Sequence, residues 1–194
     1  MVYTTLLGVT KNVIGAVMDN MLISEYNSET LDKTVRNVVQ LLELNGYTIS
    51  TAESCTGGLL SQLITSVPGA SAVFEAGFCT YANRMKTQIL GVPDAELEQF
   101  GAVSSQVALS MVKGLKACTG ADICVSVTGI AGPGGGTDEK PVGTVWFGFS
   151  AFGREFTRLP KLWTLADKSR QNIRMAAAAF AFGVIEEILL EEVQ

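Results

Sequence analysis

Three short segments of the sequence contain the side chains best suited to chemistry. The first reads Thr-Ala-Glu-Ser-Cys-Thr-Gly-Gly over residues 51–58, the second holds a tyrosine and a lysine within residues 80–86, and the third is a glycine-rich stretch over residues 128–136. Ser54 in the first segment could act as a nucleophile, with neighbouring backbone amides facing a developing oxyanion. Lys86 in the second could act as a base if poor contact with water or a nearby cation depressed its pKa. The third segment could wrap a phosphate or a ribose through its backbone amides.

Each segment also has a structural interpretation that involves no chemistry. Ser54 or Thr56 could cap a helix, and Lys86 could be a solvated surface lysine. Residues 128–136 could form a flexible hairpin. Composition favours these interpretations when each segment is judged separately, so the case for chemistry depends on the three segments occurring together.

The sequence contains no histidine. This absence excludes Ser-His-Asp and Cys-His hydrolases, HExxH metalloproteases and histidine-ligated zinc sites. A general base must then be Lys, Glu, Asp, Tyr or Cys. The four cysteines form no Cys-x-x-Cys pair, and neither a Walker A nor a Gly-x-Gly-x-x-Gly pattern occurs. We therefore expect no metal and no bound cofactor.

The composition is that of an ordinary globular domain, with 47% hydrophobic and 17% charged residues. The formal net charge of -5 argues against direct nucleic-acid binding, although a local pocket could still bind an anionic substrate. The longest apolar stretch, Met175 to Ile185, is too short to span a bilayer. Reduced cysteines and the lack of a convincing signal peptide predict a cytoplasmic protein, and the apolar final helix favours a homo-oligomer.

Hydrophobic periodicity predicts an α/β domain with a mixed sheet. We expect strands over residues 47–52, 74–81, 123–127 and 144–152, and helices that begin near residues 28, 59, 83, 105 and 173. Each of the three chemical segments follows one of these strands, which is where α/β proteins usually bind ligands. Residues 1–26 show only weak periodicity and are interpreted as an N-terminal extension to a domain over residues 27–194.

Taken together and in order, the motifs resemble the C-terminal domain of the competence/damage-inducible protein CinA, a family that includes the stand-alone PncC nicotinamide-nucleotide amidases. The resemblance covers residues 28–194. It rests on Thr-Ala-Glu-Ser-Cys-Thr-Gly-Gly at 51–58, Phe-Cys-Thr-Tyr-Ala-Asn at 78–83, Lys86, Leu-Gly-Val at 90–92, Gly-Ala-Val-Ser at 101–104, Val-Thr-Gly-Ile-Ala-Gly-Pro at 127–133 and Lys-Pro-Val-Gly-Thr-Val-Trp at 140–146.

The resemblance implies a three-layer α/β/α sandwich with a mixed sheet of about five strands. It also implies deamidation of nicotinamide mononucleotide to nicotinate mononucleotide and ammonia. By the same resemblance Ser54 is the nucleophile, Lys86 is the base and Tyr81 belongs to their hydrogen-bond network. The substrate-binding residues are then expected to be Glu53, Cys55, Thr56, Gly57, Gly58, Thr80, Asn83, Thr128, Gly129, Ala131, Gly132, Arg170 and Arg174.

The sequence is compatible with several alternatives. Family members often carry Gly-Asp-Arg before the last helix, whereas this chain has Lys-Ser-Arg at residues 168–170. Arg170 and Arg174 are therefore alternative ligands for a substrate phosphate, and Cys55 is a rival nucleophile to Ser54. The whole domain could instead be a catalytically weak nucleotide-binding module, or an interaction module linked to competence or DNA damage.

Overall fold

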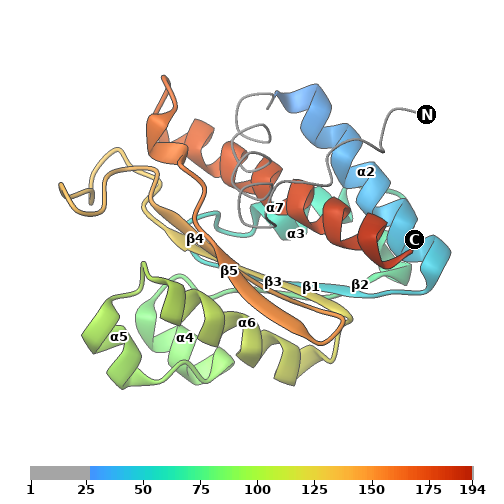
Figure 1. Ribbon diagram of the computed structural model, residues 1–194, viewed down its shortest axis with the longest axis horizontal. Coiled ribbons are helices and arrows are strands. Elements are labelled where there is room, and N and C mark those ends of the chain that lie inside the picture. The colour runs from blue at the N-terminus through green and yellow to red at the C-terminus, as the bar shows by residue number, and fades with distance from the viewer. Residues whose placement is uncertain (1–26, 194) are drawn as a thin grey trace, which may run out of the picture.

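The computed structural model describes residues 27–193, which fold around one five-stranded mixed sheet (Figure 1). The strands are β1 (Ile49–Glu53), β2 (Phe74–Cys79), β3 (Ile123–Gly129), β4 (Val145–Ala151) and β5 (Arg154–Arg158). Their order in the sheet is β2-β1-β3-β4-β5. β1 pairs in parallel with both β2 and β3, while β4 runs antiparallel to β3 and to β5.

Two helical layers cover the two faces of the sheet (Figure 1). The first layer contains α2 (Ser28–Asn45), α3 (Leu59–Thr65) and α7 (Arg170–Glu192), and the second contains α4 (Asn83–Leu90), α5 (Asp94–Phe100) and α6 (Ser105–Thr119). A separate hydrophobic cluster fills the space between each layer and the sheet. The predicted three-layer α/β/α sandwich with a mixed sheet is therefore confirmed. The expected N-terminal extension, residues 1–26, lies outside the described residues.

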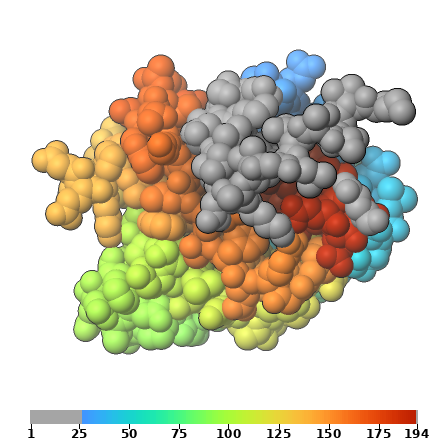
Figure 2. Space-filling model, viewed as in Figure 1, coloured from blue at the N-terminus to red at the C-terminus, as the bar shows by residue number. Residues whose placement is uncertain are grey.

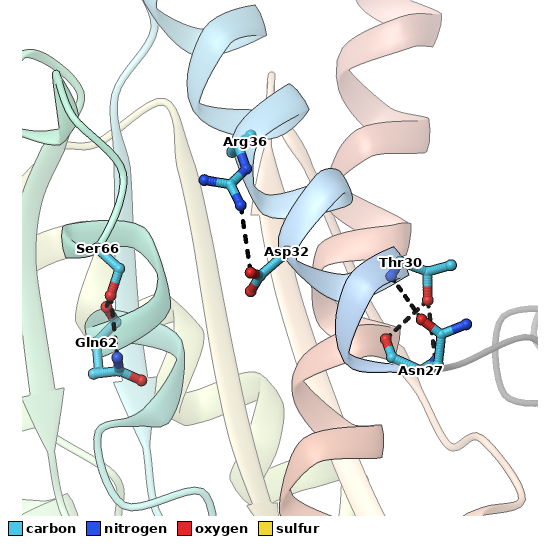
Figure 3. A network of polar contacts seen from close by, with 6 residues as sticks. All are labelled: Asn27, Thr30, Asp32, Arg36, Gln62 and Ser66. Carbon is cyan, nitrogen blue, oxygen red and sulfur yellow. Dashed lines mark hydrogen bonds and ion pairs between the residues drawn. The ribbon is translucent and has the colours of Figure 1, made fainter.

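Local sequence signals explain where α2 begins and ends. The Asn27 side chain accepts a hydrogen bond from the Thr30 amide (2.8 Å), and the Thr30 hydroxyl accepts one from the Asn27 amide (3.0 Å), which together form a capping box (Figure 3). Gly46 ends the helix in the left-handed conformation, with φ of 68°. An exposed Arg36–Asp32 ion pair on the outer face of this helix contributes little stability.

The long helix α7 is buried on several sides because α2 and α3 pack against it within the first layer and β4 of the sheet lies against it as well. Its apolar run was the longest in the sequence, yet no helix within residues 27–193 is long and apolar enough to cross a membrane. Ile173, Phe180 and Ile188 on this helix are almost fully buried. Packing inside a three-layer domain thus accounts for the apolar character of the described part of this helix.

One strand, one α-helix and two 3-10 helices, η1 (Ala70–Ala72) and η2 (Leu162–Thr164), were not predicted from the sequence. β5 reads Arg-Glu-Phe-Thr-Arg and lies at the edge of the sheet, where charged residues are tolerated and no apolar alternation is needed. Helix α5 has no buried residue, so its sequence lacks an apolar stripe. The four strands that were predicted are present, and their ends differ from the predicted ends by at most two residues.

The topology brings three segments together at one end of the sheet, where the parallel strands finish; we call this end the carboxyl edge. β1, β2 and β3 are parallel neighbours, so the residues that follow them lie side by side at their carboxyl ends. The segment between β3 and β4, residues 130–144, projects from the body of the domain at this end (Figures 1 and 2). The three chemical segments of the sequence are thereby placed around a common site.

Candidate active site

Ser54 is the first residue after β1, and neighbouring strands hold its backbone on both sides. Its amide donates to the Val127 carbonyl of β3 at 2.9 Å. The preceding carbonyl, that of Glu53, accepts a hydrogen bond from the Thr80 amide at the end of β2 at 2.8 Å. The nucleophile candidate is therefore fixed between two strands, in the half-buried position that a reactive serine needs.

Lys86 approaches Ser54 from α4, on the second helical layer. Its Nζ lies 3.1 Å from Ser54 Oγ and 2.9 Å from the Thr80 carbonyl oxygen, and a longer contact of 3.4 Å reaches the Tyr81 carbonyl. The side chain is only 1% exposed, so the interpretation as a solvated surface lysine is wrong. Residues 32 positions apart in the chain thus form a Ser–Lys pair.

The electrostatics of the pair favour a neutral lysine. Burial lowers the pKa of Lys86 from its ordinary value of 10.5, because the charged form loses its hydration. The thiols of Cys55 and Cys79 act weakly in the opposite direction. No carboxylate forms an ion pair with Lys86 among the described residues. A lowered pKa increases the share of the neutral lysine, which is the form that can accept a proton.

Glu53 organises the loop that follows Ser54, which we call the nucleophile loop (residues 54–58). Its buried carboxylate accepts hydrogen bonds from the amides of Gly58 (3.0 Å), Leu60 (3.1 Å) and Ser61 (2.9 Å). The cap of α3 is thus supplied by Glu53, while the helix has no capping side chain at its N-cap residue, Gly58. The interpretation of Ser54 or Thr56 as the cap is therefore wrong. Glu53 faces the loop backbone, which makes it an orienting residue.

Three further residues that the sequence reasoning missed support Glu53. The Ser61 hydroxyl donates to Glu53 Oε1 at 2.9 Å and lies 2.7 Å from the Thr51 hydroxyl. Gly77 on β2 leaves the room for Ser61, since a Cβ there would overlap Ser61 Oγ. Three features of the sequence could have pointed to these residues. Thr51 is a polar residue within a buried strand, Ser61 is a serine on an otherwise apolar helix face, and Gly77 is a glycine within a strand.

Both glycines of the nucleophile loop have backbone conformations that other residues rarely adopt. Gly57 has φ of 64° and Gly58 has φ of 92°. These values let the chain turn sharply from β1 into α3 while the amides of Gly58, Leu60 and Ser61 converge on Glu53. The two glycines are thus required for the shape of the loop.

Cys55 has neither the exposure nor the ionisation that a cysteine nucleophile needs. Its side chain is 5% exposed and belongs to the hydrophobic core of the first layer, on the side of the sheet opposite to Lys86. Burial raises the pKa of the Cys55 thiol to about 12, so the thiolate needed for attack is scarce at neutral pH. This favours Ser54 over Cys55.

Two arginines of α7 reach the site from the opposite face of the sheet. Arg170 donates from Nη2 to the Tyr81 hydroxyl (2.7 Å) and from Nη1 to the Gly132 carbonyl (2.9 Å). Arg174, one turn later, donates from Nη2 (2.7 Å) and Nε (3.1 Å) to the Thr56 carbonyl. Arg170 therefore lies on the exposed side of the site, whereas Arg174 contacts the nucleophile loop.

The segment after β3 is anchored at both ends, unlike a freely flexible hairpin. Thr128 donates its hydroxyl to the Ala102 carbonyl at 2.7 Å. At the other end, Lys140 Nζ donates to the carbonyls of Phe100 (3.1 Å) and Val103 (2.9 Å). Ala131 is buried, and residues 133–139 between these anchors are exposed. This arrangement holds the start of the segment close to Tyr81 and Arg170.

The remaining site residues predicted from the sequence differ in their environments. Gly129 ends β3, where a Cβ would lie 2.7 Å from the Thr144 carbonyl, so this position favours glycine. Asn83 is exposed at the first turn of α4. Thr56 and Thr80 are fully buried, and their hydroxyls have no hydrogen-bond partner among the described residues. All predicted site residues therefore lie at or beside the carboxyl edge of β1, β2 and β3.

The CinA C-terminal domain family matches residues 31–189 of this chain. The chain belongs to the CinA C-terminal domain family. A nicotinamide-nucleotide amidohydrolase PncC of Enterobacter agglomerans is 48% identical over 141 residues, which cover 72% of this chain and 84% of that protein. A CinA-like protein of Kosmotoga olearia is 48% identical over 153 residues, or 79% of this chain and 36% of that protein.

Solved structures of CinA proteins share the fold. The protein CihA of Agrobacterium tumefaciens has a TM-score of 0.76 and 39% identity, over 84% of this chain and 96% of that one. A CinA superfamily protein of Escherichia coli has a TM-score of 0.77 and 30% identity, over 87% of this chain and 96% of that one. The chain spans 39% or less of the length of several longer CinA relatives, so it corresponds to one part of those proteins.

Proposed function

We propose that this chain hydrolyses the carboxamide of nicotinamide mononucleotide, giving nicotinate mononucleotide and ammonia. The observation that carries the proposal is the 3.1 Å contact between Ser54 Oγ and the Nζ of a buried lysine, Lys86. This pair supplies a nucleophile and a base without histidine. The similarity to a protein named as a nicotinamide-nucleotide amidohydrolase supports this choice of substrate.

In the first step Lys86 acts as the base. A neutral lysine has two N–H bonds and one lone pair. If the two N–H bonds are donated to the carbonyls of Thr80 and Tyr81, the lone pair faces the Ser54 hydroxyl. Ser54 Oγ then forms a bond to the carboxamide carbon while its proton passes to Lys86, which becomes an ammonium ion.

The following steps return the site to its starting state. The C–N bond of the tetrahedral intermediate breaks as the Lys86 ammonium gives its proton to the departing nitrogen, and ammonia leaves. Water then attacks the acyl-enzyme and transfers a proton to neutral Lys86. The C–O bond to Ser54 breaks, Ser54 regains the proton, and the product leaves as a carboxylic acid that ionises in water. No metal or cofactor takes part in these steps.

The oxyanion of the intermediate requires amide donors close to Ser54. The Gly57 amide donates to the Ser54 carbonyl (3.1 Å) and the Gly58 amide donates to Glu53, so neither is available. The amides of Cys55 and Thr56 have no acceptor elsewhere within residues 27–193. These two amides are therefore the oxyanion donors that we propose, and one such donor contributes about 3 kcal/mol.

The substrate phosphate is assigned to Arg170 in this proposal. Arg170 is exposed beside the site, and a guanidinium binds phosphate through two parallel hydrogen bonds. Its contacts with the Tyr81 hydroxyl and the Gly132 carbonyl would orient it toward a nucleotide that enters between these segments.

Replacement of Arg170 by glutamine is expected to raise the KM for nicotinamide mononucleotide about 10- to 100-fold, because a charge-assisted contact to phosphate is lost. The kcat should change little. Steady-state ammonia release with nicotinamide mononucleotide and with nicotinamide riboside checks this, since the riboside lacks the phosphate. An equal loss of affinity for both substrates would contradict the phosphate assignment.

The test of the function itself is ammonia release from nicotinamide mononucleotide by the full chain, with Ser54→Ala as the comparison. We expect turnover by the wild type without added metal and none by Ser54→Ala. A folded wild type that binds the nucleotide without releasing ammonia would instead indicate a binding module.

The cellular context is part of the same proposal. We infer that residues 27–194 form the functional domain, that the protein works in the cytoplasm, and that it self-associates. Exposed apolar side chains near the end of α7, Leu190 and Val193, support self-association. Light scattering coupled to gel filtration would give the oligomeric state directly.

A further inference from the structure

Arg174 places two hydrogen-bond donors on one backbone carbonyl of the nucleophile loop. Nη2 and Nε contact the Thr56 oxygen at 2.7 and 3.1 Å, and Nη1 contacts Gln171 at 3.3 Å. A permanently charged group is thus held against an uncharged peptide group two residues after Ser54. Hydrogen bonds from a charged donor are stronger than those between neutral groups, and they polarise the peptide that accepts them.

A second hydrogen bond continues from the same peptide group. The carbonyl of Thr56 and the amide of Gly57 belong to one peptide plane, and the Gly57 amide donates to the Ser54 carbonyl at 3.1 Å. The Ser54 carbonyl in turn shares its peptide plane with the Cys55 amide. The guanidinium, the Thr56–Gly57 peptide and the Ser54–Cys55 peptide are therefore linked in series, and each bond in such a series strengthens the next.

The series ends at the Cys55 amide, which has only a weak partner of its own. The Cys55 amide has no backbone or side-chain acceptor on another residue within residues 27–193. It contacts its own thiol, and a protonated thiol sulfur is a weak acceptor; burial keeps this thiol protonated by raising the pKa of Cys55 to about 12. This amide directly follows the nucleophilic Ser54, which is where an acyl-transfer enzyme needs a donor.

We propose that Arg174 is a positioning residue that fixes and polarises the Cys55 amide as an oxyanion donor through these two peptide groups. Arg174 then acts on the transition state and leaves binding of the substrate phosphate to Arg170. The two arginines, one helical turn apart on α7, have different tasks because they contact different partners. Arg174 contacts the Thr56 carbonyl, and Arg170 contacts the Tyr81 hydroxyl and the Gly132 carbonyl. This inference rests on the proposed amidase function.

The test compares Arg174→Gln, Arg174→Lys and Arg36→Gln in the full chain. Arg36 is an exposed arginine on α2 and serves as the matched control. The measurements are kcat and KM for nicotinamide mononucleotide, the Kd of the product nicotinate mononucleotide, and the melting temperature. We expect Arg174→Gln to lower kcat about 10- to 100-fold. This loss is at most as large as the loss caused by removing a whole oxyanion donor. KM and Kd should change by less than about threefold. Arg174→Lys keeps the charge and should recover part of the kcat.

Two results would overturn the inference. One is a KM and a product Kd that weaken about 10-fold or more while kcat is kept, which would make Arg174 a substrate ligand. The other is a kcat for Arg174→Gln equal to that of the wild type. If Arg174→Gln does not fold, Arg174→Lys decides the question by the same comparison of kcat with Kd. A wild type that releases no ammonia would overturn the amidase proposal and this inference together, whereas an active wild type with either of the two results overturns the inference alone.

Discussion

Replacing Lys86 by methionine is expected to lower kcat for ammonia release about 10³- to 10⁴-fold. Methionine has a similar length and suits a buried position, but it cannot accept the Ser54 proton or return it to the departing nitrogen. General-base catalysis alone contributes 10²- to 10⁴-fold, and Lys86 would serve as both base and acid. The side chain is almost fully buried, so an apolar replacement should keep the fold. Steady-state ammonia release and thermal melting check the two parts of this expectation.

The control for this substitution is Lys33→Met on α2. Lys33 is exposed on α2, in the first helical layer, and it forms no hydrogen bond or ion pair with a site residue among residues 27–193. Its replacement should leave kcat and KM unchanged. If Lys86→Met kept more than about a tenth of the wild-type kcat, another group would have to be the base.

The wild-type pH profile gives an independent readout of the same group. Lys86 must be neutral to accept a proton, so kcat/KM should rise with pH as its ammonium form loses a proton. Because burial lowers the pKa of Lys86, this rise should be centred below 10.5, the ordinary lysine value. An acidic limb centred at or above that value would contradict the role of burial in activating the lysine.

The sequence was sufficient for the residues whose signal is local. The apolar periodicity of α2, the glycines of the nucleophile loop and the order of the motifs all indicated where the helices and the site would lie. The three segments could be expected at one place because parallel strands place their carboxyl ends together. The family membership and the sandwich fold that the motifs implied were confirmed.

What the sequence could not supply was the partner of each polar group. Nothing in the spacing says that Arg174 contacts the Thr56 carbonyl while Arg170 contacts Tyr81, since both are arginines one turn apart on a helix that is distant in sequence. The burial of Lys86 was equally hidden, because lysines are mostly exposed and only the tertiary packing of α4 encloses this one. The support that Ser61 gives to Glu53 depends on the space left by a glycine on a neighbouring strand.

Glu53→Gln is expected to produce the second large effect, in this case on stability as well as on activity. One carboxylate oxygen accepts from the amides of Gly58 and Leu60, and the other accepts from the amide and hydroxyl of Ser61. Glutamine has the same shape but must place its NH₂ group where one of these oxygens was. The NH₂ group is itself a donor, so the two donors that contacted the replaced oxygen would lose their acceptor in a fully buried position.

We expect the free energy of unfolding of Glu53→Gln to fall by about 2–4 kcal/mol, since hydrogen bonds to a charged acceptor are lost and buried donors are left unsatisfied. Its kcat should fall about 10- to 100-fold, because a nucleophile loop that is no longer held cannot keep its oxyanion donors in place. Urea denaturation and ammonia release measure these quantities, and Glu75→Gln, an exposed carboxylate on β2, is the matched control. Lost activity with unchanged stability would mean that Glu53 takes part in the chemistry directly, whereas lost stability with lost activity follows from the contacts of its two carboxylate oxygens with the start of α3.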